Sequence, residues 1–176
     1  MKSFEDKIQA RPFVKWVGGK TQLLDEVKKS LPRDFSTRQH ITYVEPFVGG
    51  GAVLFWILQE FPNIERAVIN DINRELVCTY SVIKNKVEEL IDVLAEYQAE
   101  YQAMDDDYRK DYFLGKRSRY NEHPESDVET AALFIFLNRT CFNGLYRVNS
   151  KGAFNVPFGR YANPKICDAE PLRADS

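Results

Sequence analysis

The chain has 176 residues, of which 44% are hydrophobic and 28% are charged. This composition is typical of one soluble globular domain with a substantial core. The net charge of −2 predicts neither a nucleic acid nor a membrane as a partner of the chain as a whole. The three cysteines and two histidines are widely spaced and form no metal-binding pattern, so we expect no metal and reduced thiols. The amino-terminal residues MKSFEDKIQA lack the apolar core of a signal peptide, and no apolar run is long enough to span a bilayer. We therefore expect a cytoplasmic monomer that does not bind membranes.

The first half of the chain predicts alternating helices and strands. RPFVKWVGGK ends in a Gly-Gly turn, and TQLLDEVKKSLP then has helical spacing and stops at Pro32. ITYVEPF and RAVINDI are short apolar segments that predict two buried strands, and GAVLFWILQEF between them predicts a helix. Asn73 is a candidate N-cap for a long amphipathic helix that ends near residue 98. The order strand, helix, strand, helix over residues 41–98 predicts a parallel sheet with right-handed connections.

The second half differs in composition and charge. Residues 99–130 are acidic and predict short helices on a solvated surface, with tyrosines that pack between helices at positions 97, 101, 108, 112 and 120. VETAALFIFLN predicts an apolar helix, and YRV and AFNV flank NSKG as the two arms of a β-hairpin. From Asn138 to Lys165 the chain carries five basic residues and no acidic residue. A local positive charge in an acidic protein indicates an anionic partner at this place.

The stretch YVEPFVGGGAVLFW, Tyr43 to Trp56, indicates a ligand site. A strand that turns through three glycines into a helix lets main-chain N–H groups approach a ligand, because no side chain blocks them. Glu45 ends the first strand. Asp71 is predicted to end the second, about 20 residues after the glycines, where a carboxylate can accept hydrogen bonds from ribose hydroxyls. The alternative for Asp71 is an acid favoured by the dipole of the helix that follows.

The surrounding residues exclude two common nucleotide sites. A dinucleotide site usually has a third glycine, where this chain has Val53 and Leu54. A phosphate-binding loop needs the sequence Gly-Lys-Ser/Thr at its end. The stretch GGKT, Gly18 to Thr21, contains this sequence, but it lacks the earlier glycine of the motif and a preceding strand of useful length. S-adenosylmethionine fits better. Its site needs acceptors for the ribose hydroxyls and groups that bind the methionine end, but it needs no phosphate-binding loop.

Four motifs occur in the order in which Dam-type DNA adenine-N6 methyltransferases carry them: FVKWVGGKTQLL, VEPFVGGGAV, INDIN and FLNRTCFNGLYRVNSKGAFNVPFGRY. The chain resembles this family from about Arg11 to Lys165. The resemblance implies an α/β fold: part of a Rossmann-like sheet of an S-adenosylmethionine-dependent methyltransferase, with an inserted, mainly helical DNA-recognition region that bears a hairpin. It implies a cofactor-binding part at residues 1–98, a recognition region at 99–165, and the start of a catalytic half at 166–176.

The resemblance also implies two sets of site residues. The set for S-adenosylmethionine is Trp16, Lys20, Glu45, Phe47, Gly49, Gly50, Gly51 and Asp71. The set for double-stranded DNA, with the hairpin in the major groove, is Arg139, Phe142, Asn143, Leu145, Arg147, Asn149, Lys151 and Arg160. From residue chemistry alone, Arg147 can contact a guanine edge, while Arg139, Lys151 and Arg160 can contact phosphates. Core packing is the alternative for two phenylalanines; it is favoured for Phe154 and open for Phe142.

The family's catalytic motif, [DNS]-P-P-[YFW], holds the N6 amine of a flipped adenine. No Pro-Pro dipeptide occurs in this chain, so its catalytic residues are unassigned. We expect a site-specific DNA adenine-N6 methyltransferase of which these residues form about the amino-terminal two-thirds, inactive on their own. The alternative is a non-catalytic DNA-binding remnant or fragment of such an enzyme.

Overall fold

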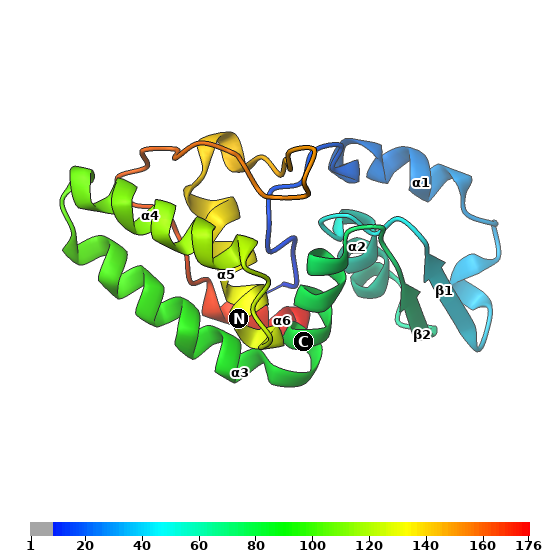
Figure 1. Ribbon diagram of the computed structural model, residues 1–176. Coiled ribbons are helices and arrows are strands. Elements are labelled where there is room, and N and C mark those ends of the chain that lie inside the picture. The colour runs from blue at the N-terminus through cyan, green and yellow to red at the C-terminus, as the bar shows by residue number, and fades with distance from the viewer. Residues whose placement is uncertain (1–8) are drawn as a thin grey trace.

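The computed structural model describes residues 9–176, in which a group of helices lies beside a smaller part containing two strands (Figure 1). The smaller part holds α1 (Leu24–Ser30), β1 (Ile41–Glu45), α2 (Ala52–Glu60) and β2 (Ile64–Ile69), in the predicted order. The prediction about a signal peptide concerns mainly residues 1–8, which lie outside the described residues.

The two strands pair in parallel, with Tyr43 opposite Ala67 and Glu45 opposite Ile69, which confirms the predicted parallel pair. The prediction that both strands are buried is wrong, because Val44 is 60% exposed and Val68 is 38% exposed. Among residues 9–176 no third strand extends this sheet, so these side chains have no neighbouring strand beside them. The second strand also ends earlier than predicted, and Asp71 therefore follows β2 rather than ending it.

The long helix α3 (Arg74–Ala103) begins as predicted, because the Asn73 side chain accepts a hydrogen bond from Leu76 N at 2.7 Å. The helix runs past its predicted end near residue 98, so the proposed boundary between residues 98 and 99 falls within it. Its backbone leaves helical geometry at Lys86, where φ is −144° and ψ is 37°. Helix α3 packs against α5 (Asp127–Thr140) and α6 (Ala169–Asp175).

Residues 106–121 form one helix, α4 (Asp106–Asn121), rather than the short solvated helices that the acidic composition predicts. Its first-turn acids face solvent, while Phe113 and Tyr120 are buried against the rest of the bundle. The tyrosines pack between helices as expected except for Tyr108, which is 67% exposed. Helix α5 is buried on all sides from Ala131 to Asn138, which explains why residues 131–137 are all apolar.

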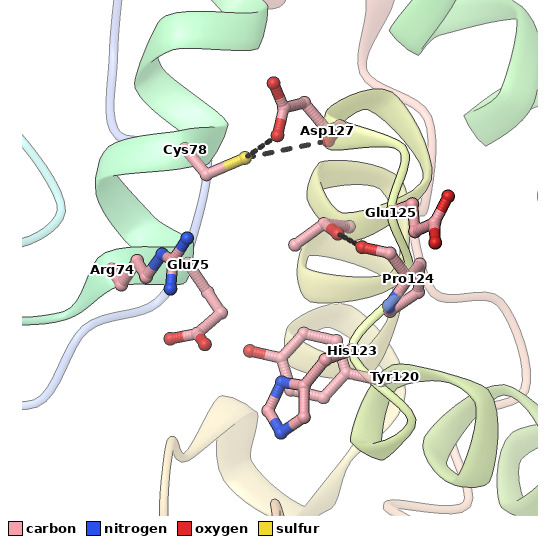
Figure 2. A pocket seen from close by; sticks show the side chains of 9 residues that line it. Arg74, Glu75, Cys78, Tyr120, His123, Pro124, Glu125 and Asp127 are labelled. Atoms are coloured by element: carbon pink, nitrogen blue, oxygen red, sulfur yellow. Dashed lines mark hydrogen bonds between the residues drawn. The ribbon is translucent and has the colours of Figure 1, made fainter.

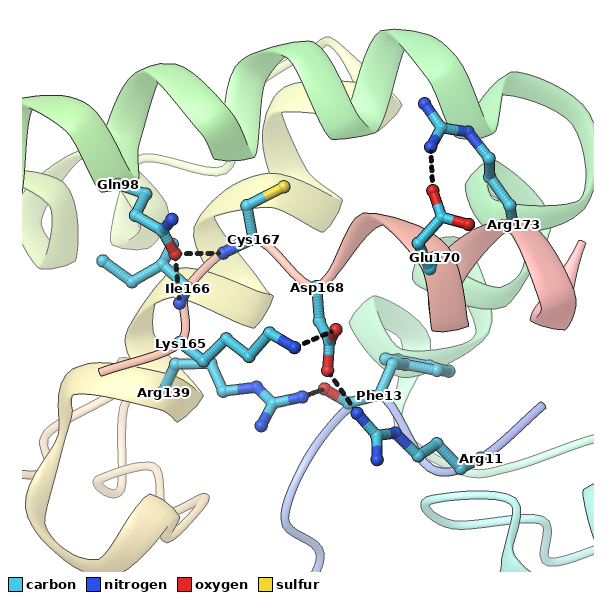
Figure 3. Close-up of polar contacts among 10 residues, drawn as sticks. All are labelled: Arg11, Phe13, Gln98, Arg139, Lys165, Ile166, Cys167, Asp168, Glu170 and Arg173. Atoms are coloured by element: carbon cyan, nitrogen blue, oxygen red, sulfur yellow. Dashed lines mark hydrogen bonds and ion pairs between the residues drawn. The ribbon is translucent and has the colours of Figure 1, made fainter. Parts of the chain in front are cut away.

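Residues 165–176 return to the amino-terminal segment and to α3 (Figure 3). The side-chain oxygen of Gln98 accepts hydrogen bonds from the main-chain nitrogens of Ile166 and Cys167, both at 3.0 Å. The Asp168 carboxylate is 8% exposed and bridges two cations, Arg11 at 2.7 Å and Lys165 at 2.6 Å. These two pairings lower the pKa of Asp168 against the opposing effect of burial, so both ends of the described chain are held together by a charged contact.

The side-chain amide of Asn138 joins the amino-terminal segment to α5. The side chain of Asn138, 3% exposed, accepts from Lys15 N and donates to Lys15 O, each at 2.8 Å. The same side chain donates to Gly144 O at 2.9 Å. Three main-chain groups of two distant segments are therefore satisfied by one residue.

We predict that Asn138→Ala lowers the free energy of unfolding by about 2–4 kcal/mol, because it removes two part-buried hydrogen bonds to the main chain of Lys15 and leaves the buried Gly144 O without this partner. Chemical denaturation of the two proteins measures the difference. The matched control is Asn85→Ala, an exposed amide on α3, which should change the free energy by about 0.5 kcal/mol or less. Equal losses in the two variants would contradict the role assigned to Asn138.

Candidate functional site

The chain turns sharply between β1 and α2, and its glycines are required there. Gly49 and Gly51 have positive φ angles of 53° and 84°. A Cβ atom on Gly51 would lie 2.5 Å from the Tyr80 hydroxyl and 2.7 Å from the Phe55 ring. Both the backbone conformation and the lack of space thus exclude a side chain at this position.

Trp16 lies against this turn. A Cβ atom on Gly49 would be 3.0 Å from Trp16 Cδ1, and one on Gly50 would be 3.2 Å from Trp16 Cβ. The two glycines therefore allow the indole to pack on the main chain. The same indole stacks on Tyr146, with ring centroids 5.4 Å apart and an interplanar angle of 29°. Trp16 thus touches both the glycine turn and the segment that leads into the hairpin.

A buried carboxylate at the end of β1 is paired with a lysine. Lys20 Nζ lies 2.8 Å from Glu45 Oε1 and donates to Phe47 O at 2.5 Å. Glu45 is 5% exposed, and its second oxygen accepts from the Tyr43 hydroxyl at 2.7 Å. Burial, together with this bond to a carboxylate, raises the pKa of Tyr43, so the phenol remains a donor. The result is a positive and a negative group held next to each other beside the turn.

Asp71 connects the glycine turn to the start of α3. Its Oδ2 accepts from Gly49 N at 2.9 Å, and its Oδ1 accepts from Asn73 N at 3.0 Å. The second contact agrees with the interpretation of Asp71 as an acid at a helix start. Each oxygen keeps a lone pair that could accept from a ligand.

A pocket of about 280 Å³ lies between the Gly18–Gly19 turn and the glycine turn. Trp16, Lys20, Gly49 and Gly50 line it, so four of the residues expected to bind cofactor converge here. Glu45 and Asp71 do not line the pocket and contact lining residues from behind. Phe47 is 71% exposed next to the pocket, and Gly51 begins α2.

The hairpin predicted around NSKG is confirmed, although its arms pair through a single bridge between Val148 and Phe154. Asn149 N donates to Ala153 O at 2.9 Å, and Gly152, with a φ of 80°, completes the turn. The base is fixed to α4, because the side chain of Asn121 accepts from Phe154 N at 2.8 Å and donates to Phe154 O at 3.1 Å. Phe154 is 3% exposed, so core packing, the favoured alternative for this residue, is confirmed.

Seven of the eight residues expected to bind DNA are exposed around this hairpin: Phe142, Asn143, Leu145, Arg147, Asn149, Lys151 and Arg160. Phe142 is 52% exposed, which excludes the core-packing alternative for it. Arg139 is the exception, because its guanidinium turns inward and donates to Phe13 O at 2.8 Å (Figure 3). Burial lowers the pKa of Arg139, and its contacts give no support to a role in binding phosphate.

Sequence reasoning missed two residues that hold this arrangement together, Asn138 and Tyr146. Asn138 could have been recognised, because it ends the apolar run AALFIFLN. An amide buried with such a run requires hydrogen-bond partners and therefore indicates a contact with another segment. Tyr146 lies within the recognition motif, but its stacking on Trp16 depends on a segment far away in the sequence.

A second cavity of about 310 Å³ lies where α3, α4 and α5 meet, lined by Arg74, Glu75, Cys78, Tyr120, His123 and Asp127, among others (Figure 2). Cys78 Sγ lies 3.6 Å from Asp127 Oδ1. Burial and the charge of Asp127 raise the pKa of Cys78 to about 11, so this thiol is not a nucleophile at neutral pH. No residue of either predicted set lines this cavity.

Residues 9–176 lack two kinds of feature. The described part of the chain contains no group of three or more His, Cys, Asp or Glu side chains placed to hold a metal ion. None of its helices combines the length and the hydropathy needed to cross a membrane.

We predict that Gly51→Ala lowers the free energy of unfolding by about 2–4 kcal/mol, because it adds a steric clash to the cost of a positive φ. Gly152→Ala is the matched control, since Gly152 has a nearly equal φ of 80° and a Cβ atom added there would meet no other atom within 4 Å. The control should cost only about 1 kcal/mol. Denaturation midpoints that shift equally in both variants would show that the clash contributes nothing.

Comparison with known proteins relates nearly the whole described segment to one family. The family described as D12 class N6 adenine-specific DNA methyltransferase matches residues 16–175. A type II methyltransferase of Methanocaldococcus jannaschii is 45% identical over 168 residues, which cover 94% of this chain and 58% of that protein. A type II methyltransferase of Lactococcus lactis subsp. cremoris is 42% identical, covering 98% of this chain and 56% of that protein. A DNA adenine methylase of Haemophilus influenzae is 39% identical, covering 90% and 50%. The chain thus spans between half and three-fifths of the length of these relatives.

Proposed function

The chain belongs to the D12 class of N6 adenine-specific DNA methyltransferases, and we propose that the protein it forms transfers a methyl group from S-adenosylmethionine to adenine N6 in duplex DNA. In this proposal β1 and β2 belong to a Rossmann-like sheet and α2 is the helix that connects them. Residues 99–165 are the inserted recognition region, and residues 166–176 begin the return to the catalytic half. The transfer requires one site for the cofactor and one for DNA, and two separate features of the chain support them.

The pocket beside the glycine turn is the proposed cofactor site, with the eight residues named for it in the sequence. S-adenosylmethionine brings a zwitterionic amino-acid end and a ribose, and when bound it supplies the methyl group. Lys20 lines the pocket and offers its ammonium to the carboxylate of the amino-acid end, while Glu45, 2.8 Å from Lys20, holds that ammonium in place from outside the pocket lining. The free lone pairs of Asp71 are acceptors for ribose hydroxyls. The absence of a phosphate-binding motif from the glycine turn agrees with a cofactor that has no phosphate.

The exposed face of the hairpin is the proposed DNA surface. Arg147, Lys151 and Arg160 place positive charge on a segment without acidic residues, and a two-stranded ribbon fits the major groove. Phe142, Asn143, Leu145 and Asn149 lie beside these cations and complete the surface. We leave Arg139 out of this surface, because its guanidinium is bound to Phe13 O.

The observation that carries the proposal is that one residue, Trp16, contacts both the pocket and the recognition segment. Trp16 packs on Gly49 and Gly50 on one side and stacks on Tyr146 on the other. Asn138 fixes the main chain of Lys15, the neighbour of Trp16, to α5 and Gly144. Direct contacts thus join the pocket to the recognition segment, which supports a reaction between a cofactor bound at one and a base bound at the other.

For the cofactor, we predict that Asp71→Ala weakens binding of S-adenosylmethionine by about 1–3 kcal/mol, through loss of charge-assisted hydrogen bonds. Isothermal titration calorimetry measures the affinity, and Asp25→Ala, an exposed acid in the first turn of α1, is the control that should leave it unchanged. Because Asp71 also holds Gly49 N, thermal melting must confirm that the variant is folded at the assay temperature. Unchanged affinity in a folded Asp71→Ala variant would remove Asp71 from the site.

For DNA, we predict different effects for two neighbouring cations, measured in a protein that contains this chain together with the remaining length of its relatives. Arg147→Ala should cost about 1–3 kcal/mol on the preferred duplex and abolish discrimination at one base pair. Lys151→Ala should weaken binding equally on all sequences and reduce the slope of log affinity against log salt by about one. Full discrimination by Arg147→Ala would mean that the hairpin binds only phosphates.

A further inference from the structure

The side chain of Arg147 is held by the residue opposite it in the hairpin, Asn155. Arg147 Nε donates to Asn155 Oδ1 at 2.7 Å, and Arg147 Nη2 donates to Asn155 O at 3.2 Å. The main chains of the two residues are also paired, because Asn155 N donates to Arg147 O at 3.1 Å. One residue thus supplies three contacts to Arg147.

Asn155 is itself fixed in place. Its neighbours Phe154 and Val156 are 3% and 1% exposed, so the strand on which it lies is anchored in the core on both sides. The main chain of Asn155, and with it the origin of its amide side chain, is therefore anchored, while Arg147 lies on the exposed arm of the hairpin.

The two bonds occupy one edge of the guanidinium and leave the other free. A guanidinium has five N–H donors in a plane, and the bonds to Asn155 use the Nε donor and one Nη2 donor. The remaining Nη2 donor and one Nη1 donor lie parallel at the end of the group, and the second Nη1 donor points back toward Cδ. Two parallel donors are what the N7 and O6 atoms of guanine accept. The bound edge therefore fixes the direction in which the free end points.

The choice of an amide has an electrostatic consequence. A carboxylate at this position would hold the guanidinium equally well but would neutralise its charge. Asn155 is neutral, and no acidic residue occurs between Asn138 and Lys165. The anchor thus fixes the side chain of Arg147 and leaves its full positive charge available to DNA.

We propose that Asn155 is a positioning residue that sets the base discrimination of Arg147, an inference that rests on the proposed DNA-binding function. A free arginine samples many rotamers, and the cost of ordering it on binding reduces the difference between correct and incorrect base pairs. An arginine already ordered by Asn155 loses its contacts when the base is wrong and cannot turn to an alternative acceptor.

The experiment measures binding of the full-length methyltransferase to the preferred duplex and to its single-base variants, at several salt concentrations. Asn155→Ala should reduce discrimination at the base pair that Arg147 contacts by about tenfold, the equivalent of one charge-assisted hydrogen bond, and change non-specific affinity less than about twofold. Asn155→Asp keeps the acceptor but cancels the charge. It should retain discrimination, weaken binding to all sequences and reduce the salt slope by about one. Asn163→Ala, an exposed amide outside the hairpin, is the control that should change neither quantity.

A double mutant separates positioning from a general effect on the hairpin. If Asn155 acts through Arg147, Asn155→Ala should cost no further discrimination in an Arg147→Ala background. A further loss there, or full discrimination in Asn155→Ala alone, would overturn the inference. If Arg147→Ala flattens discrimination while Asn155→Ala does not, the inference fails and the proposed function stands. If Arg147→Ala itself has no effect on discrimination, both fail. Thermal melting of each variant identifies a loss that results from unfolding.

Discussion

The buried amide of Asn138 is the contact on which the arrangement of this chain depends. It pairs with Lys15 through both its oxygen and its nitrogen, as a neighbouring strand would, and its second hydrogen binds Gly144 O. The approach is close, since a Cβ atom on Gly144 would lie 2.9 Å from Lys15 Cβ. The amide therefore sets the spacing between the segment that lines the proposed cofactor pocket and the segment that leads into the proposed DNA surface. Lys15 lies in no helix or strand. Its main-chain groups therefore have no hydrogen bonds of regular secondary structure that could substitute for those of the amide.

The distribution of ion pairs explains how an acidic protein keeps a basic surface. Several cations on the helices are paired with acids, as Arg119 is with Glu129 and Arg173 with Glu88. Within residues 9–176, Arg147, Lys151 and Arg160 form no ion pair. The positive charge of these three side chains is thus not neutralised within the described residues, although the whole chain has a net charge of −2.

Those features whose causes are local could be predicted from the sequence. Asn73 caps α3 through its own side chain, and the positive φ of Gly51 follows from a turn that only glycine adopts. The inward turn of Arg139 could not be predicted, because its partner is the carbonyl of Phe13, on a segment remote in sequence. The exposure of Val44 was missed for a related reason. Its apolar character is that of a buried strand, but the sheet among the described residues has only two strands. The charge of Arg139 and the apolar character of Val44 are evident from the sequence. Whether each side chain is buried depends on segments that are distant in the sequence or on the number of strands beside it.

The hairpin is divided between a fixed base and a free tip, and this has a consequence for the substitutions that it tolerates. Phe154 and Asn121 join the base to the core, whereas Asn149 to Gly152 project into solvent. Substitutions of exposed side chains that make no such contacts usually change the free energy of unfolding by about 0.5 kcal/mol or less. The side chains of Ser150 and Lys151 can therefore be exchanged at little cost in stability, so a change in the chemistry of the proposed DNA surface carries little risk of losing the fold.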